Sequence, residues 1–256
     1  MLGRDRRYWN LLREFTLSWF KLRDQGSVFG FLWTLLHPLV LLLLLYTLFG
    51  EKLGVEVPHF RIYVLIGIVH WSFFATATGK AVGALTQRVD LVANTSFPRE
   101  LLVFSDVGSV LISFVLEVAV LLAFVVFEGL SLGAACVALP VVIALEGIFV
   151  LGVSLVLAGL QVFLVDVQRI WAIVLRIGFF GVPIFWPMAM LEGNRFRLAF
   201  ELNPLTQFMS FTRVALIEGK LPPLGWLAYT VSVSLLLFGL ALALFKRAEC
   251  RFAERL

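Results

Sequence analysis

The sequence predicts an all-α integral membrane protein with six transmembrane helices, an N-terminal amphipathic interface helix and a re-entrant helical segment before the last span. Of the 256 residues, 61% are hydrophobic and only 15% are charged. The mean hydropathy is +0.97, which is too high for a soluble domain of this length. Several apolar runs also reach the roughly 20 residues that a helix needs to cross the hydrocarbon core.

Residues 1–28 are predicted to form a cytoplasmic interface helix. Tyr8, Leu12, Phe15 and Trp19 recur at spacings of three or four, and polar residues occupy the opposite face. This pattern is typical of an amphipathic helix at the membrane surface, with its aromatic rings at headgroup depth. A helix that packs on a soluble partner is the alternative interpretation.

Residues 29–186 are predicted to hold spans one to five, and residues 224–245 the sixth. The six apolar runs are Phe29–Phe49, Tyr63–Leu85, Val107–Phe127, Leu139–Val165, Ile170–Trp186 and Leu224–Phe245. An even number of spans puts both termini on one side. That side carries thirteen Lys and Arg residues against six on the other. The positive-inside rule therefore predicts that both termini, including the tail 246–256, are cytoplasmic.

Residues 187–223 form the long external segment, but they are too apolar for a simple polar loop. Asn203-Pro204 interrupts any single helix through this segment. We expect two short helices that dip back into the outer leaflet, because irregular backbone at membrane depth must be covered by protein or line a cavity.

The motifs of common enzymes and metal sites are absent. The sequence has no H-E-x-x-H, G-x-S-x-G, C-x-x-C or G-x-x-x-x-G-K-[ST] pattern. His37, His59 and His70 share no ligand spacing, so no metal site is predicted. The net charge of +4 indicates orientation and contact with anionic membrane lipid rather than binding of nucleic acid.

Four ionisable residues lie inside the apolar spans, where each needs a partner or water. Lys80 and Glu117 lie on consecutive spans, as do Glu146 and Arg176. Buried ion pairs are the favoured interpretation for the glutamates. Two interpretations stay open for Arg176, namely a buried ion pair and a place in the wall of a substrate path. The second is included because its span is aromatic and broken by Pro183.

Aromatic side chains make up 14% of the chain, and most are expected to face lipid or the interfacial belts. Rings on the first two spans could instead stack on sugars. These rings are Trp33, Tyr46, Trp71, Phe73 and Phe74.

Five motifs, in their order along nearly the whole chain, resemble those of the ABC-2 exporter permeases. They are F-K-L-R-D-Q-G-S-V-F-G-F-L-W-T-L-L-H-P (20–38), F-P-R-E-L (97–101), V-F-L-V-D-V-Q-R-I (162–170), V-P-I-F-W-P (182–187) and L-N-P-L-T-Q-F (202–208). The most similar subgroup exports lipid-linked O-antigen, teichoic acid or capsular polysaccharide across the bacterial cytoplasmic membrane.

The resemblance implies a homodimer of six-span subunits with two copies of a separate ATPase, which would bind ATP and magnesium; no cofactor is expected in this chain. It makes residues 88–97 a coupling helix that docks on the ATPase, with coupling residues Arg88, Asp90, Leu91, Phe97, Arg99 and Glu100. It also places the substrate path at the dimer seam of spans one and five.

The residues expected to line the substrate path are aromatic, apart from one cation. They are Phe29, Trp33, Tyr46, Trp71, Phe73, Phe74, Arg176, Phe180, Phe185 and Trp186. Rings tolerate a sliding sugar chain, and Arg176 would meet the phosphate of the lipid anchor. Two alternatives remain open. One is an ABC-2 exporter of a drug, a lipid or another small amphiphile, and the other is a membrane enzyme or scaffold.

Overall fold

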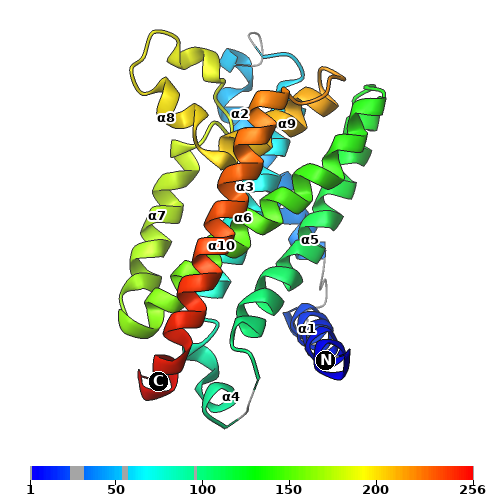
Figure 1. Ribbon diagram of the computed structural model, residues 1–256. Coiled ribbons are helices and arrows are strands. Elements are labelled where there is room, and N and C mark those ends of the chain that lie inside the picture. The colour runs from blue at the N-terminus through cyan, green and yellow to red at the C-terminus, as the bar shows by residue number, and fades with distance from the viewer. Residues whose placement is uncertain (1, 24–31, 54–56, 95–96, 256) are drawn as a thin grey trace.

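The computed structural model describes residues 2–23, 32–53, 57–94 and 97–255, and these are helical along most of their length (Figure 1). The α-helices are α1 (Leu2–Arg23), α2 (Leu32–Leu53), α3 (Phe60–Val82), α4 (Val89–Asn94), α5 (Glu100–Phe127), α6 (Leu139–Phe163), α7 (Val167–Gly181), α8 (Arg197–Glu201), α9 (Pro204–Leu216) and α10 (Leu224–Arg255). Three 3-10 turns are η1 (Thr86–Arg88), η2 (Ala134–Ala138) and η3 (Met188–Leu191). The described ranges contain no strand, which confirms the all-α prediction.

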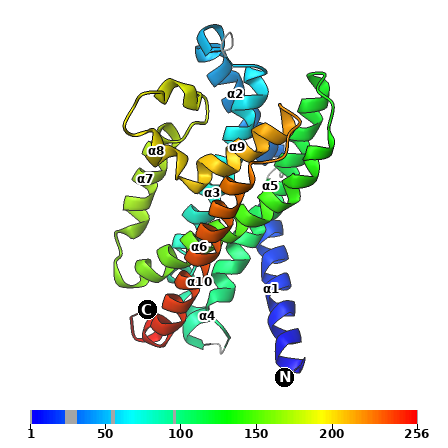
Figure 2. The ribbon, with the colours of Figure 1, turned by 45° about the horizontal axis from the view of Figure 1, so that its top comes forward.

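The long helices form a bundle with two different ends. Both views show α1, α4 and the C-terminal part of α10 at one end, while α8 and α9 lie toward the other (Figures 1 and 2). The two termini of the chain are thus on the same end, as an even number of crossings requires.

Four helices in the described part of the chain are long and apolar enough to cross a membrane. They are Phe60–Val82, Glu100–Phe127, Ala134–Phe163 and Leu224–Phe252. Each overlaps one predicted span, namely the second, third, fourth and sixth. The chain is therefore an integral membrane protein by the length and composition of its helices.

The other two predicted spans correspond to α2 and α7. Helix α2 covers the described part of the first span, and Pro38 lies inside it. The predicted fifth span, Ile170–Trp186, is not helical along its whole length, which agrees with the predicted break at Pro183. Helix α7 starts earlier and has only 15 residues, because the backbone becomes extended at Val182, just before Pro183. A residue that precedes proline is disfavoured in the helical conformation, which explains this end point.

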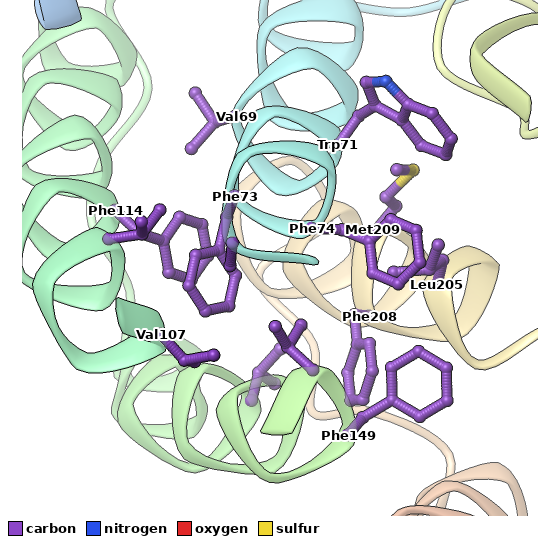
Figure 3. Packing of buried hydrophobic residues seen from close by; sticks show 14 of the residues in the cluster. Val69, Trp71, Phe73, Phe74, Val107, Phe114, Phe149, Leu205, Phe208 and Met209 are labelled. Atoms are coloured by element: carbon purple, nitrogen blue, oxygen red, sulfur yellow. The ribbon is translucent and has the colours of Figure 1, made fainter. Parts of the chain in front are cut away.

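Helix α3 is the centre of the bundle and packs against α2, α5, α6, α7 and α9. Phe73 stacks on Phe114 of α5 with ring centroids 4.4 Å apart, and Phe74 packs on Phe149 of α6. Figure 3 shows Phe74 and Phe149 near Phe208 and Met209 of α9, and the ring centroids of Phe149 and Phe208 are 6.0 Å apart. Dense packing of this kind fixes where α9 sits, since cores of interlocking side chains resist displacement.

Helices α6 and α10 make the most extensive helix pair. A Cβ atom on Gly152 would lie 3.1 Å from the Leu237 side chain and from the Phe238 backbone nitrogen. Ser154 and Ala158, two further small residues on the same helix, are fully buried. Small residues let the two helix backbones approach closely, as in many membrane bundles.

Two short helices, α8 and α9, interrupt the segment 187–223, as predicted. Asn203 caps α9, because its side-chain oxygen accepts a hydrogen bond from the Leu205 amide at 3.1 Å, and Pro204 occupies the first turn. Ten residues of α9 are buried, from Leu205 to Leu216. Helix α9 is thus part of the bundle, whereas α8 has no buried residue.

Candidate functional site

Three of the residues predicted to line a substrate path surround one shallow cavity between α2, α3 and α7. Its volume is about 410 Å3, and its lining is Leu41, Trp71, Leu175, Arg176, Phe179 and Phe180. Trp71, Arg176 and Phe180 belong to the predicted set. Arg176 is exposed and Phe180 is 66% exposed. Rings and one guanidinium thus share an open surface of this chain.

The contacts between α7 and α3 determine which face of α7 is exposed. Trp171 Nε1 donates to Thr78 Oγ1 on α3 at 3.0 Å. Gly178 lies in the last turn of α7. A Cβ atom there would be 2.7 Å from Trp71 Cη2, so only glycine fits without displacing the indole. These contacts turn the opposite face outward. That face is apolar and exposed, and it consists of Ile170, Ile173, Val174, Ile177 and Phe180.

The segment after α7 carries two further predicted path residues. Phe185 stacks on Phe49 of α2 with ring centroids 4.9 Å apart. Trp186 donates from Nε1 to the Phe180 carbonyl at 3.3 Å and packs edge-on against Phe200. The rings of α2, α7 and the 182–187 segment therefore form one continuous aromatic cluster, which joins the cavity to α8.

The remaining predicted path residues lie elsewhere. Tyr46 is 40% exposed, and the guanidinium of Arg61 lies 5.5 Å from its ring centroid. Phe73 and Phe74 are buried in the core of the chain and have no face open to a substrate in this conformation. Phe29 and the side chain of Trp33 are outside the described residues.

One of the ion pairs predicted within the spans differs from the structure. Glu146 lies against His70 rather than Arg176, because Glu146 is fully buried in the bundle and Arg176 is on the exposed side of α7. Lys80 lies 3.3 Å from Asp106 Oδ1 and donates to Ser109 at 2.9 Å.

A buried polar network links three helices and was missed by the sequence analysis. His70 of α3 lies 2.6 Å from Glu146 Oε2 of α6 through Nδ1, and 2.9 Å from Thr212 Oγ1 of α9 through Nε2. All three side chains are almost fully buried. The only sequence signal was a histidine and a glutamate in apolar runs, and nothing in the spacing showed that they meet. The network anchors α9 to the bundle.

Arg213 is a second anchor that sequence reasoning missed, because it was counted only as a loop cation. It donates to the carbonyls of Tyr63, Pro183 and Ile184 at 3.1, 2.8 and 3.0 Å through Nη2. Its guanidinium carbon also lies 3.4 Å from the Tyr63 ring centroid. One buried guanidinium thus joins α9, α3 and the 182–187 segment.

The opposite end of the bundle holds the predicted coupling residues. Arg88 makes a bidentate pair with Asp106 of α5, at 2.8 and 2.9 Å, and lies over the Trp19 ring of α1 at 4.2 Å. Asp106 is fully buried. Arg88 therefore connects the coupling segment to α1 and α5 within the chain. Asp90, in the first turn of α4, is exposed.

The other predicted coupling residues tie α5 to its neighbours. Phe97 packs edge-on against Phe15 of α1 at 6.0 Å. The Arg99 amide donates to Glu249 at 2.9 Å, and Glu100 lies 3.5 Å from Lys246. Leu91 is partly buried on α4. Movement of this segment would thus reach both α1 and the end of α10.

Helix α1 forms as predicted and packs along α5. Thr16 fits against Gly108, where a Cβ atom would lie 3.1 Å away. Partial burial, with a further contribution from Glu100, raises the pKa of Tyr8 to about 12, so its phenol stays neutral at physiological pH. Leu12 and Trp19 are also half-buried. The predicted apolar face therefore meets protein along part of its surface.

No group of three or more His, Cys, Asp or Glu side chains that could hold a metal ion occurs in the part of the chain that was described. In the α3–α6–α9 network, His70 is hydrogen-bonded to Glu146 and to Thr212. The arrangement offers hydrogen bonding and ring stacking.

Comparison with known proteins agrees with this architecture. The model of the ABC-2 type transporter family matches residues 11–217. The O-antigen export system permease protein RfbA of Myxococcus xanthus is 30% identical over 248 residues, which cover 96% of this chain and 95% of that protein. Two proteins of the same name from Klebsiella pneumoniae are 24% identical over 246 residues, which cover 96% of this chain and 94% of each of them.

Proposed function

Because this chain belongs to the ABC-2 type transporter family, we propose that it is the permease subunit of an exporter of lipid-linked polysaccharide of the O-antigen type. The observation that carries the proposal is the similarity to O-antigen export permeases over nearly the full length of both chains. The aromatic cluster of α2, α7 and residues 182–187 suits this cargo, since rings can stack on sugars without holding them by charge.

The proposed assembly is a homodimer in which α2 and α7 of each copy face each other. The exposed apolar face of α7 supports this arrangement, because it needs lipid or protein to cover it. Two copies related by a two-fold axis would place the cavity of Trp71, Arg176 and Phe180 on both sides of a shared path. Six helices of one subunit are too few to enclose a passage for a polymer.

The proposed energy source is a separate ATPase subunit that binds ATP and magnesium. The sequence has no phosphate-binding loop of its own. The end of the bundle with α1, α4 and the end of α10 is basic, and we propose that it faces the cytoplasm and docks on two ATPase copies. In this arrangement α2 and α7 complete six spans, and α8 and α9 form the re-entrant segment in the outer leaflet.

A deletion of the gene in the source bacterium tests the proposed function. We expect lipid-linked polysaccharide to accumulate inside the cell and to disappear from its surface, and the wild-type gene on a plasmid should restore export. The alternative cargo, a small amphiphile, predicts normal surface polysaccharide and altered drug or lipid efflux. That second result would overturn the proposal.

A further inference from the structure

The last turns of α10 carry three exposed arginines on one side of the helix. Arg247, Arg251 and Arg255 follow one another at spacings of four, so their side chains leave the same side of an α-helix; we call them the arginine stripe. Among the described side chains, none forms an ion pair or hydrogen bond with these guanidinia. Figure 1 shows this part of α10 at the end of the bundle that also holds α1 and α4.

The side of α10 that carries the arginine stripe is apolar in the turns before it. Leu236, Leu240 and Leu244 lie on this side and are 65, 64 and 60% exposed. Arg247 follows Leu244 by three residues, which keeps it in line with the leucines. Helix α10 is one of the four helices that are long and apolar enough to cross a membrane. The leucines therefore face acyl chains, and the arginines continue the same lipid-facing surface.

The opposite side of α10 determines this orientation. Phe245 and Phe252 are almost fully buried with ring centroids 5.1 Å apart, and Phe252 also packs on Phe163 of α6. The Glu249 carboxylate accepts a hydrogen bond at 2.9 Å from the Arg99 amide, next to the start of α5. Because these contacts hold the last turns of α10 against α5 and α6, the arginine stripe points away from the bundle.

The helical rise places the first two arginines at the depth of the lipid headgroups. The span begins at Leu224. At about 1.5 Å per residue, Arg247 lies about 35 Å and Arg251 about 40 Å along the helix axis from Leu224. The hydrocarbon core is about 30 Å thick, and about 40–45 Å with its headgroup regions. Side chains of a helix lean toward its N-terminus, so both guanidinia reach back toward the headgroups.

The chemistry of this surface matches an anionic phospholipid. A guanidinium stays charged and binds phosphate oxygens through paired hydrogen bonds. The acyl chains of the same lipid would cover the exposed leucines. Glu254 follows Arg251 by three residues, so the three arginines and this acid give the stripe a net charge of +2 in the sequence. A zwitterionic lipid offers the same phosphate, but its own cation cancels the attraction.

Two other partners fit the arginine stripe less well. A soluble ATPase subunit is kept from Arg247 by the headgroups, and it would leave the neighbouring leucines in lipid. The phosphate of the exported cargo is a further candidate. However, the cavity with Arg176 is lined by residues of α2, α3 and α7, and none of its lining residues comes from α10.

We propose that the arginine stripe, with the leucines beside it, is a binding site for anionic phospholipids of the bilayer. The site goes beyond the proposed function, because it does not depend on which cargo is exported. It also lies on the same helical turns that hold Arg99, a predicted coupling residue, through Glu249. Bound phospholipid would fix the depth of this end of α10 in the membrane.

The test compares two phospholipids around a fluorescent label on α10. The exposed Cys250 becomes the single cysteine in Cys136→Ala and is labelled with bimane. The full-length chain is placed in phosphatidylcholine nanodiscs that contain a small, fixed fraction of a nitroxide-labelled quencher, either phosphatidylglycerol or phosphatidylcholine with the same acyl chains. Quenching gives the relative association constant of the two lipids. We expect phosphatidylglycerol to bind about five- to twenty-five-fold more tightly, the effect of one to two arginines.

Three double variants assign this preference to the arginine stripe. Arg247→Gln with Arg251→Gln should remove it, and the Tm should stay unchanged because both side chains are exposed. Arg247→Lys with Arg251→Lys should keep most of it, since the charge is retained. Arg6→Gln with Arg7→Gln is the matched control. It removes the same charge from exposed positions of α1 at the same end of the bundle and should leave the preference intact.

Equal binding of the two lipids by the parent chain, or a preference that survives in the glutamine pair, would overturn the lipid site. Displacement of phosphatidylglycerol by added ATPase subunit, or by added lipid-linked polysaccharide, would assign the stripe to that partner instead. The nanodiscs of the main experiment contain no cargo. Their result therefore holds or fails independently of the proposed function, which the gene deletion tests.

Discussion

Gly67→Ala should displace the segment that joins α7 to helices α8 and α9. A Cβ atom on Gly67 would lie 2.8 Å from both the Cα and the carbonyl oxygen of Ile184. Favourable contacts begin at about 3.5 Å, so the backbone at Ile184 would have to move by about 0.7 Å. That carbonyl also accepts from Arg213 at 3.0 Å, and the Ile184 side chain is fully buried.

The expected cost follows from overpacking against backbone. Added atoms in a packed core cost about 1–3 kcal/mol, and alanine gains up to about 1 kcal/mol over glycine in a helix. A net loss of about 1–2 kcal/mol should remain, which corresponds to a Tm lower by about 2–8 °C for a chain of this size. Export should fall as well, because the aromatic segment 182–187 moves.

Gly79→Ala is the matched control on the same helix. The nearest atom to its Cβ would be Leu175 Cδ1 at 3.7 Å, an ordinary contact, so the Tm should stay constant or rise. Thermal unfolding of both variants in the same detergent is the assay. If Gly67→Ala melts at or above the temperature of Gly79→Ala, the close approach of α3 to Ile184 is not as described here.

Asp106→Asn should lower the free energy of unfolding by about 3–5 kcal/mol, because Lys80 and Arg88 lose a buried anionic partner. Asp166→Asn, in an exposed ion pair, should change it by less than about 1 kcal/mol. Thermal unfolding of both variants tests this difference. Thr212→Val should cost about 1–3 kcal/mol by leaving His70 Nε2 unsatisfied, and a neutral result would contradict the buried network. Arg176→Ala should lower export and substrate-stimulated ATPase activity without lowering the Tm, and Arg176→Lys should restore part of both; equal loss in the two variants would show that charge alone is not enough.

The helices and their order could be predicted from the sequence, because apolar runs and proline breaks are local signals. The two helices in the segment 187–223 followed from Asn203-Pro204, and the short α4 followed from the resemblance, which implied a coupling helix in residues 88–97. The break at Pro183 was predicted and lies next to the end of α7, whereas the predicted span ran on to Trp186, since the extended segment 182–187 is as apolar as the helix before it.

Partners between helices could not be predicted in the same way. Lys80 pairs with Asp106, which lies just before the predicted third span, Val107–Phe127. His70 meets Glu146 and Thr212 across 76 and 142 residues of sequence. Such contacts depend on the rotation and height of whole helices, which hydropathy does not encode. The sequence likewise did not show which aromatic rings are in the core and which are on the surface. Phe73 and Phe180 were both predicted to line the substrate path, but Phe73 is buried and Phe180 is exposed.

The ATPase activity of the reconstituted complex tests the central claim most directly. The pure chain should hydrolyse no ATP, and hydrolysis should appear when the cognate ATPase subunit is added in nanodiscs. Lipid-linked polysaccharide should then stimulate the rate, and the free lipid carrier or a hydrophobic drug should not. Hydrolysis by the pure chain, or stimulation by the drug but not by the polysaccharide, would contradict the account of this protein as the permease of a polysaccharide exporter.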